Sequence, residues 1–205
     1  MKITAIAGGV GGSKLAQGLS EILEPDELKI VVNTGDDFRF FGLYISPDID
    51  TVTYTLANLS NPVTGWGVRD ETFHTFETLK RNGSPAWFML GDKDLATHME
   101  RTRQLNEGKT LTEVCRFFNN AWQVKHPVLP MTNDPVPTCI DTIEQGLLPF
   151  QEYFAKHHCE PTIKEVIFQG MDSATPTPEV LDALHNCDAV VICPSNPLLS
   201  IDPIL

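Results

Sequence analysis

The first thirty residues constrain the fold of this chain more than any other stretch. A short apolar run, residues 3–7, leads into the glycine-rich turn 8–12, and a second apolar run covers residues 28–32. Between the two runs, apolar residues recur every three or four positions, the spacing of an amphipathic helix, until Pro25 ends the helix. Strand, glycine turn, helix and strand in about thirty residues predict a βαβ unit with parallel strands and a right-handed crossover.

Three loops are expected to meet at one edge of the resulting sheet. Gly8–Gly12 and Asn33–Asp37 each follow a predicted strand, and Pro194–Pro197 follows the apolar run Ala189–Cys193. Ligands of such sheets bind outside the carboxyl ends of the strands. We therefore predict an α/β protein with a Rossmann-like three-layer core, a mostly parallel sheet and a crevice at this edge.

The middle of the chain, about residues 51–121, is predicted to be a mostly helical insertion. Residues 38–50 before it look irregular, and a helix is expected to begin at Asp50 or Thr51, either of which can act as its cap. Asp70 is expected to cap a further helix.

Two later helices of the insertion are indicated by different patterns. A helix over about 92–105 places apolar side chains near one face, with His98 near that face and Arg101 off it. Residues 110–113 form a capping box, which predicts the start of another helix. In the helix predicted over about 92–105, the side chains near the apolar face are Leu95, Met99, Thr102 and Leu105.

Beyond the insertion, the sequence alternates strand and helix patterns. The segment 189–193 is rich in Val and Ile and predicts a parallel strand buried on both faces. The other expected elements are strands at 128–131, 137–143 and 165–169, a short helix near 150–154, and a helix with Pro178 in its first turn.

The composition argues against several classes of function. A formal net charge of −12 disfavours a nucleic acid or an anionic membrane surface as the partner. No apolar run approaches the ~18 residues of a membrane span, and the N-terminus lacks the pattern of a signal peptide. The five cysteines contain no CxxC pair, which fits reduced thiols. We expect a cytoplasmic protein that acts on small molecules as a homodimer.

The glycine turn has two readings. Gly9 and Gly11 supply the first half of the dinucleotide pattern GxGxxG, but Lys14 occupies the sixth position, so that pattern is not met. The turn is either a tight connection without a ligand or a phosphate site. In the second case the loop N–H groups and the helix N-terminus hold the phosphate, with Ser13 or Lys14 as side-chain contacts.

Clustered polar residues follow the first two predicted strands. The acids Asp36, Asp37, Asp48 and Asp50 lie within fifteen residues. Carboxylate oxygens of this kind suit a hard cation such as Mg²⁺; the alternative is a group of solvated loop acids with a helix cap. Asn33 and Asn196, each just past a predicted strand, either contact a nucleotide base or ribose or stabilise their own loops.

Taken together, these segments resemble the 2-phospho-L-lactate transferase family of coenzyme F420 biosynthesis. The matching segments follow one another along essentially the whole chain, at residues 8–15, 32–37, 45–52, 65–67, 70–72, 87–98, 101–102, 129–134 and 194–197. The resemblance implies a phosphotransferase for substituted phosphate groups. Members move a phospho-2-hydroxyacid, of phospholactyl or phosphoenolpyruvyl type, from a guanosine diphosphate-linked donor to the deazaflavin Fo. GMP is released, F420-0 or dehydro-F420-0 forms, and Mg²⁺ is the cofactor.

The resemblance also implies a role for individual residues. The nucleotide-binding set would be Gly9, Gly11, Gly12, Ser13, Asn33, Ser195 and Asn196. The Fo contacts would be Asp50 and Met89, where some members have Lys or Arg in place of Met89. The Mg²⁺ ligands would be Asp36, Asp37 and Asp48. Either Asp50 or Asp37 would be the catalytic acid that orients or deprotonates the Fo hydroxyl.

Family members continue well beyond residue 205. We therefore expect residues 1–205 to form a single Rossmann-like transferase domain that lacks the C-terminal third. Two other functions compete with the transferase. A nucleotide-sugar-binding regulator of the gluconeogenesis-factor type would carry a glycine- and serine-rich stretch where Phe38–Phe41 stands. An NAD-dependent oxidoreductase would carry the missing sixth-position glycine.

Overall fold

The computed structural model, which describes residues 1–205, is built on the predicted βαβ unit. Its elements are β1 (Ile3–Ala7), α1 (Val10–Ile22) and β2 (Leu28–Val32). The two strands run parallel, with Ile3 opposite Leu28. The predicted strands, helix and glycine turn are thus confirmed in order and in place.

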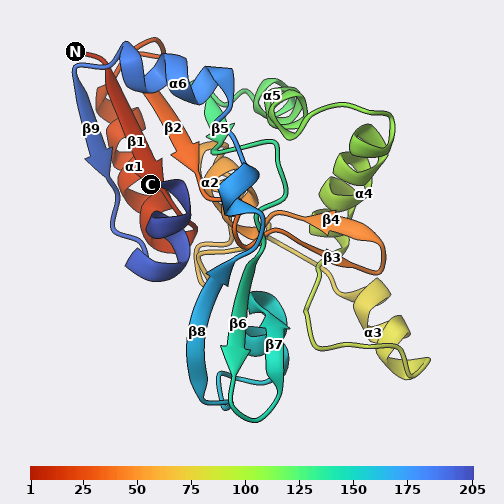
Figure 1. Ribbon diagram of the computed structural model, residues 1–205. Coiled ribbons are helices and arrows are strands. Elements are labelled where there is room, and N and C mark those ends of the chain that lie inside the picture. Colours follow the sequence, from red (N-terminus) through yellow and green to blue (C-terminus); the bar gives the residue numbers. More distant parts are fainter.

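The main sheet has four parallel strands in the order β5-β2-β1-β9 (Figure 1), where β5 is Val128–Pro130 and β9 is Ala189–Ile192. In chain order of the sheet strands this is 3-2-1-4, the arrangement of a Rossmann-like sheet. The strand order reverses between β1 and β9. Their carboxyl ends therefore flank the position at which such folds bind ligands.

Helices cover both faces of this sheet, which gives the predicted three layers. α1, α2 (Pro47–Leu56) and α5 (Leu111–Ala121) pack on the face that carries Ile30 and Val32. α6 (Pro178–His185) packs on the opposite face, over Val31 and Leu129. Since successive residues of β2 point to opposite faces, both sides of this strand are buried. The expected Rossmann-like α/β architecture is confirmed.

β9 differs from the prediction that it is buried on both faces. It is an edge strand that pairs only with β1. Val190 and Ile192 are 47% and 56% exposed. Both point to the face of the sheet on which α6 packs against Thr4 of β1, Val31 of β2 and Leu129 of β5. An apolar sequence was therefore not sufficient to predict burial.

The stretch that looked irregular contains a hairpin and the first turn of a helix. β3 (Phe38–Phe40) and β4 (Leu43–Ile45) pair antiparallel across the turn Phe41–Gly42. Both turn residues have positive φ, 50° and 77°, as a tight two-residue hairpin turn requires. α2 then starts at Pro47, because proline suits the first turn of a helix. The expected helix start at Asp50 or Thr51 was therefore late.

Two helices of the insertion are capped by carboxylates from distant positions in the sequence. They are α3 (His74–Arg81) and α4 (Asp92–Asn106). The Asp92 carboxylate accepts two N–H bonds of 3.0 Å from the first turn of α3. The Glu71 carboxylate accepts N–H bonds of 2.7 and 3.0 Å from the first turn of α4. Asp70, the expected cap, has φ of 53° and caps neither helix. The capping box of α5 is present as predicted.

A second, antiparallel sheet projects from the carboxyl edge of the main sheet (Figure 1). It consists of β6 (Thr138–Thr142), β7 (Gly146–Pro149) and β8 (Ile163–Phe168), with a helical turn at Glu152–Lys156. The strand β7 was not predicted, because its four residues lie in a stretch without clear alternation. Short turns at Met171–Ser173, Pro197–Ile201 and Asp202–Ile204 complete the chain. No helix combines the length and apolar composition required to cross a membrane.

The exchange of caps gives a prediction for stability. Replacing Glu71 by Ala leaves N–H groups of the first turn of α4 without their acceptor. We expect the free energy of unfolding to fall by about 1 kcal/mol, the usual effect of losing an N-cap. Asp70→Asn is the matched control and should stay within about 0.5 kcal/mol of the wild type. Urea unfolding of the three proteins makes the comparison; equal stability of Glu71→Ala and the control would contradict the capping role.

Candidate functional site

The glycine turn approaches the loop after β9 at very short range. The Gly8 N–H donates to Ser195 Oγ at 3.0 Å. A Cβ atom at Gly11 would lie 2.3 Å from the Pro194 carbonyl oxygen, and one at Gly12 would lie 2.8 Å from Ser195 Oγ. Glycine is therefore required here so that the two loops of the predicted crevice can touch.

The first turn of α1 has free hydrogen-bond donors. The N–H groups of Val10, Gly11 and Gly12 find no acceptor in the protein, while the Ser13 N–H donates to the Gly9 carbonyl. Free donors at a helix N-terminus suit an anionic group. The Ser13 hydroxyl is buried and donates to the Val10 carbonyl at 3.1 Å, so it is already engaged within the turn.

Asn33 lies at the centre of the carboxyl edge and is fully buried. Its Nδ2 donates to Asp48 Oδ2 at 3.0 Å and to the Leu199 carbonyl at 3.2 Å. Its Oδ1 accepts the Gly35 N–H at 2.7 Å. The amide thus joins the loop after β2, the first turn of α2 and the turn Pro197–Ile201, which makes it an organiser of the edge.

Asp48 accepts a hydrogen bond from this amide, and Asn33 also lowers the pKa of Asp36. Burial raises the pKa of Asp48 to about 6, against the opposing effect of hydrogen bonds from Asn33 and the Gly9 N–H. Burial also raises the pKa of Asp36 well above its usual range, and the charges of Asp48 and Asp37 raise it further. Two neighbouring carboxylates that are both buried are difficult to ionise at the same time.

Asp37 belongs to a neighbouring group of contacts. Its Oδ2 accepts a hydrogen bond of 2.9 Å from Ser46 Oγ. This bond explains why Ser46, although it is the N-cap residue of α2, makes no side-chain cap. Burial raises the pKa of Asp37 well above its usual range, and the Arg101 charge and hydrogen bonds from Ser46 and Tyr44 oppose that rise.

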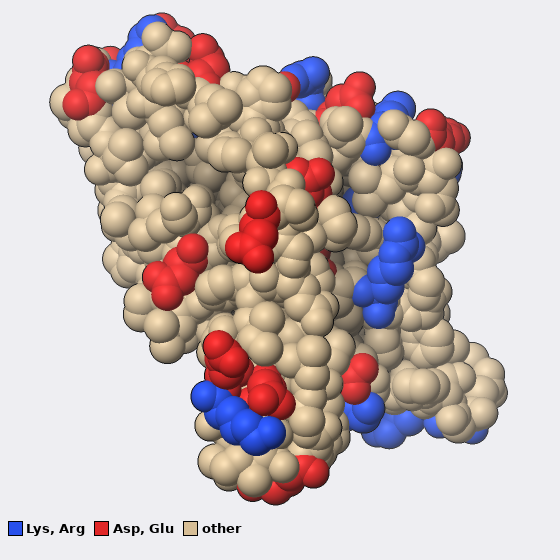
Figure 2. Space-filling model, in the orientation of Figure 1, with Lys and Arg blue, Asp and Glu red and all other residues tan.

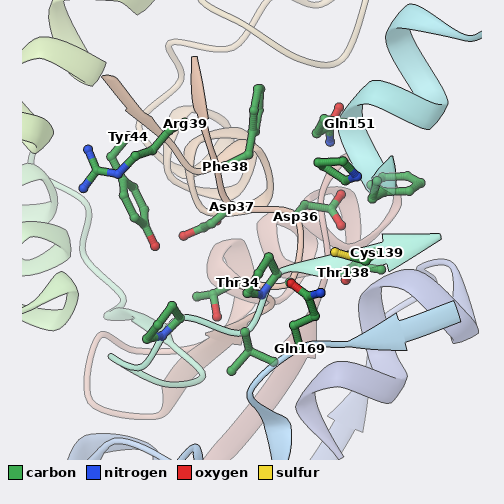
Figure 3. Close-up of a pocket in the computed structure, with 16 residues that line it drawn as sticks. Thr34, Asp36, Asp37, Phe38, Arg39, Tyr44, Thr138, Cys139, Gln151 and Gln169 are labelled. Atoms are coloured by element: carbon green, nitrogen blue, oxygen red, sulfur yellow. The ribbon is translucent and has the colours of Figure 1, made fainter. Parts of the chain in front are cut away.

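A cavity of about 320 Å³ separates the acid loop from the second sheet (Figure 3). Asp36 and Asp37 line one side, and residues of β6 together with Gln151 line the other. Figure 3 shows the Asp36 carboxylate turned toward Gln151, and that of Asp37 turned toward the Tyr44 hydroxyl. The buried oxygens in this lining without a hydrogen-bond partner are Thr34 Oγ1, Asp36 Oδ1, Asp37 Oδ1 and Thr138 Oγ1.

Asp50 lies behind this cavity and does not line it. It is 6% exposed, and its Oδ1 accepts a hydrogen bond from the Arg101 guanidinium. Arg101 is 1% exposed. The predicted apolar face of α4 is therefore wrong, because Met99 is 57% exposed and the helix instead buries polar residues. These are Thr97, His98, Arg101, Thr102 and Gln104.

The remaining predicted residues lie at different distances from this centre. Met89 is 45% exposed and lines a small separate cavity with Trp66 and Asp94. Asn196 is near the glycine turn, where its Oδ1 caps the following turn by accepting the N–H groups of Leu198 and Leu199 at 3.0 and 3.1 Å. The structure thus gathers the glycine turn, Asn33, Ser195 and the acids Asp36, Asp37 and Asp48 at one edge, with Met89 apart from them.

Several residues of this region were not singled out as site residues in the sequence. The sequence placed His98 near the apolar face of its helix and Arg101 off that face. It placed Tyr44 and Ser46 in an irregular loop. Their partners are far along the chain: Arg101 pairs with Asp50, fifty-one residues away. Nothing in the local pattern marks such pairs.

The fold and the site define a Rossmann-like α/β protein with a phosphate-type glycine turn and clustered carboxylates at the carboxyl edge. Comparison with family models gives a match to the family described as 2-phospho-L-lactate transferase CofD, over residues 3–205. The chain belongs to this family.

Curated relatives carry two names. The chain is 40% identical over 209 residues to a phosphoenolpyruvate transferase of Streptomyces griseus, with 100% of this chain and 66% of the relative covered. It is 42% identical over 206 residues to a 2-phospho-L-lactate transferase of Methanocaldococcus jannaschii, with 99% and 66% covered. The chain therefore spans just under two thirds of the length of these relatives.

Among solved structures, the fold is similar to a crystal structure of a member of the UPF0052 family from Bacillus halodurans. The TM-score is 0.64 at 20% sequence identity, and the match covers 100% of this chain and 62% of that chain. At this sequence identity the similarity shows a shared fold and nothing more.

The close approach at Gly11 can be tested with a matched pair of substitutions on one helix. Gly11→Ala places a Cβ 2.3 Å from a backbone oxygen, which should destabilise the protein by roughly 1–3 kcal/mol through overpacking. Gly18→Ala, also within α1, meets nothing within 4 Å and should stabilise by about 0.5–1 kcal/mol. Urea unfolding measures both; a stabilised Gly11→Ala would rule out the tight contact.

The raised pKa of Asp48 predicts a pH dependence of stability. The unfolded carboxyl titrates near pH ~4 and the folded one near about 6. The associated stabilisation is thus complete below the unfolded pKa and is lost as the pH rises through the folded pKa. The free energy of unfolding of wild type minus that of Asp48→Asn should fall by up to about 3 kcal/mol across this window. Urea titrations at several pH values measure it, and a pH-independent difference would contradict the burial effect.

Proposed function

We propose that this protein is a transferase that moves a phospho-2-hydroxyacid from a guanosine diphosphate-linked donor to the deazaflavin Fo. The Fo 5′-hydroxyl attacks the distal phosphorus of the donor, a phosphodiester forms and GMP leaves. The product is F420-0 from a phospholactyl donor and dehydro-F420-0 from a phosphoenolpyruvyl donor. The observation that carries this proposal is the family match over nearly the whole chain, with two relatives named as such transferases.

The geometry of the carboxyl edge supports the proposal. Free N–H groups at the start of α1 suit the donor phosphates. The loop after β9 contacts this turn through Ser195, so Ser195 and Asn196 flank the same position. Asn33 is buried behind them and fixes the loops, and we assign it to support of the nucleotide site.

Asp37 is the better placed of the two proposed catalytic acids. It lines the large cavity and keeps one oxygen without a partner, while Asp50 is engaged with Arg101 behind it. A carboxylate whose pKa is raised by burial accepts a proton more readily than an ordinary aspartate. We propose that Asp37 orients or deprotonates the Fo hydroxyl. We place Asp50 next to Asp37. Positioning and electrostatics account for most catalysis in transfers of this kind.

The acids also fit the Mg²⁺ that the family resemblance implies. Asp36 Oδ1 is a buried oxygen without a partner, which is a suitable ligand for a hard cation, and Asp37 Oδ1 is a further ligand in the alternative in which Asp50 takes the proton. Asp48 lies beside Asp36 and completes the proposed set. Bound Mg²⁺ would offset negative charge on the donor pyrophosphate. It would also relieve the repulsion that raises the pKa of Asp36.

Small-molecule substrates agree with the charge of the surface. On the face seen in Figure 2, basic side chains are scattered among acidic ones and form no continuous basic surface. With the net charge of −12, this supports a partner other than nucleic acid. A homodimer and a cytoplasmic location remain part of the proposal.

The decisive assay is Fo conversion by the full-length protein with Mg²⁺ and each of the two guanylylated donors. We expect turnover with at least one of them. Asp37→Asn should lower kcat by about 100-fold or more, since it removes the proposed proton acceptor. Asp26→Asn, an exposed acid before β2 at the opposite edge of the sheet, is the control and should keep wild-type turnover.

Ligand-induced stabilisation separates the transferase from its competitors. GDP with Mg²⁺ should raise the melting temperature, because a ligand that binds only the folded state stabilises it. NADH and UDP-N-acetylglucosamine should leave it unchanged. Stabilisation by NADH alone would favour an oxidoreductase, and stabilisation by the nucleotide sugar alone would favour a regulator of the gluconeogenesis-factor type.

A further inference from the structure

α4 crosses behind the acid loop and turns a charged face toward it. The Arg101 guanidinium is buried; it donates to Asp50 Oδ1, to His98 Nδ1 at 3.1 Å and to the Tyr44 carbonyl at 3.3 Å. A buried charge is tolerated only where partners satisfy it. The sharing of Arg101 between a carboxylate of α2 and the backbone of β4 therefore ties three elements at one point.

His98, one turn earlier on α4, approaches the other oxygen of the same carboxylate. Its Nδ1 lies 3.6 Å from Asp50 Oδ2, and its Nε2 lies 3.2 Å from Asp94 Oδ2. The Tyr54 hydroxyl in turn donates to Asp94 Oδ1 at 2.7 Å. Both oxygens of Asp50 thus face side chains of α4, and the ring that faces one of them is itself held from behind.

Asp50, Asp94, His98 and Arg101 form a buried polar network. Ligand atoms of Asp50, Asp94 and His98 lie within 4.8 Å of one another. The two acids face opposite nitrogens of the imidazole. The cation that Asp50 already contacts is Arg101.

The same guanidinium also acts on Asp37. Its charge opposes the rise in the pKa of Asp37 that burial causes. Tyr44 adds a physical link, since its carbonyl accepts from Arg101 and its phenol faces the Asp37 carboxylate (Figure 3). One side chain from the helical insertion therefore contacts Asp50, which lies behind the cavity, and acts through its charge on Asp37, which lines it.

We propose that Arg101, supported by His98, is the positioning residue of the transfer reaction, which fixes Asp37 and Asp50 relative to each other. The role rests on the proposed function, because it concerns the two acids assigned to that reaction. The helical insertion then serves to bring this guanidinium beneath the acid loop.

Arg101→Lys is the informative substitution. Lysine keeps the charge but loses the planar fork that spans two acceptors. We expect kcat for Fo conversion to fall by roughly 100-fold, as for a catalytic group displaced by about 1 Å, while KM for both substrates changes little. The unfolding midpoint should stay close to that of the control Arg103→Lys, an exposed arginine of α4 that pairs with Glu100 and Glu107.

A second variant guards against misfolding of the first. His98→Gln removes the imidazole that faces Asp50 Oδ2 and should lower kcat by about tenfold at wild-type KM, a smaller displacement than that of Arg101→Lys. If a folded Arg101→Lys protein keeps wild-type kcat, the positioning role is wrong. If that protein does not fold, a wild-type kcat of His98→Gln overturns the role instead.

The assay also separates this inference from the proposed function. If the wild type and Arg103→Lys both convert Fo, the variants judge the positioning role alone. If the wild type converts Fo with neither donor, the proposed function is wrong, and the positioning role falls with it.

Discussion

The burial of negative charge at the carboxyl edge is the constraint on which the rest of the site depends. Asp36, Asp37, Asp48 and Asp50 are each less than a tenth exposed. Buried carboxylates are costly unless hydrogen bonds or opposite charges compensate them. Asn33 and the glycine turn compensate one pair, and Ser46, Tyr44 and Arg101 compensate the other. The acids of the loop therefore determine which neighbouring elements must pack against it.

This requirement explains why the helical insertion packs as it does. A helix whose buried face carries Arg101 and His98 would be unstable against an apolar layer. It is stable here because Asp50 and Asp94 face those side chains. The insertion and the acid loop are thus complementary, and each makes the other's buried charge acceptable. The raised pKa values of Asp36 and Asp37 indicate that compensation is incomplete on the cavity side.

Local patterns predicted the sheet core well. The apolar runs, the glycine turn and Pro25 predicted β1, α1 and β2. The capping box at Thr110 predicted the start of α5. Both depend on residues close together in sequence. The hairpin β3–β4 was missed although Phe41 and Gly42 form its turn, because the alternation spans only three residues on each side. That Asp92 caps α3 and Glu71 caps α4 was not predicted, because each carboxylate accepts N–H groups that lie far from it in sequence.

The sequence alone determined the βαβ core, the position of the glycine turn and the edge at which the polar loops meet. It did so because helix and strand periodicity, tight turns and the handedness of crossovers act over a few tens of residues. Only the tertiary structure decided which acids are buried, that Asn33 is wholly engaged in holding the loops, and that Arg101 lies behind Asp50. Those facts depend on pairings between residues far apart along the chain. For such pairs, desolvation and electrostatic compensation, and not local propensity, select the partner.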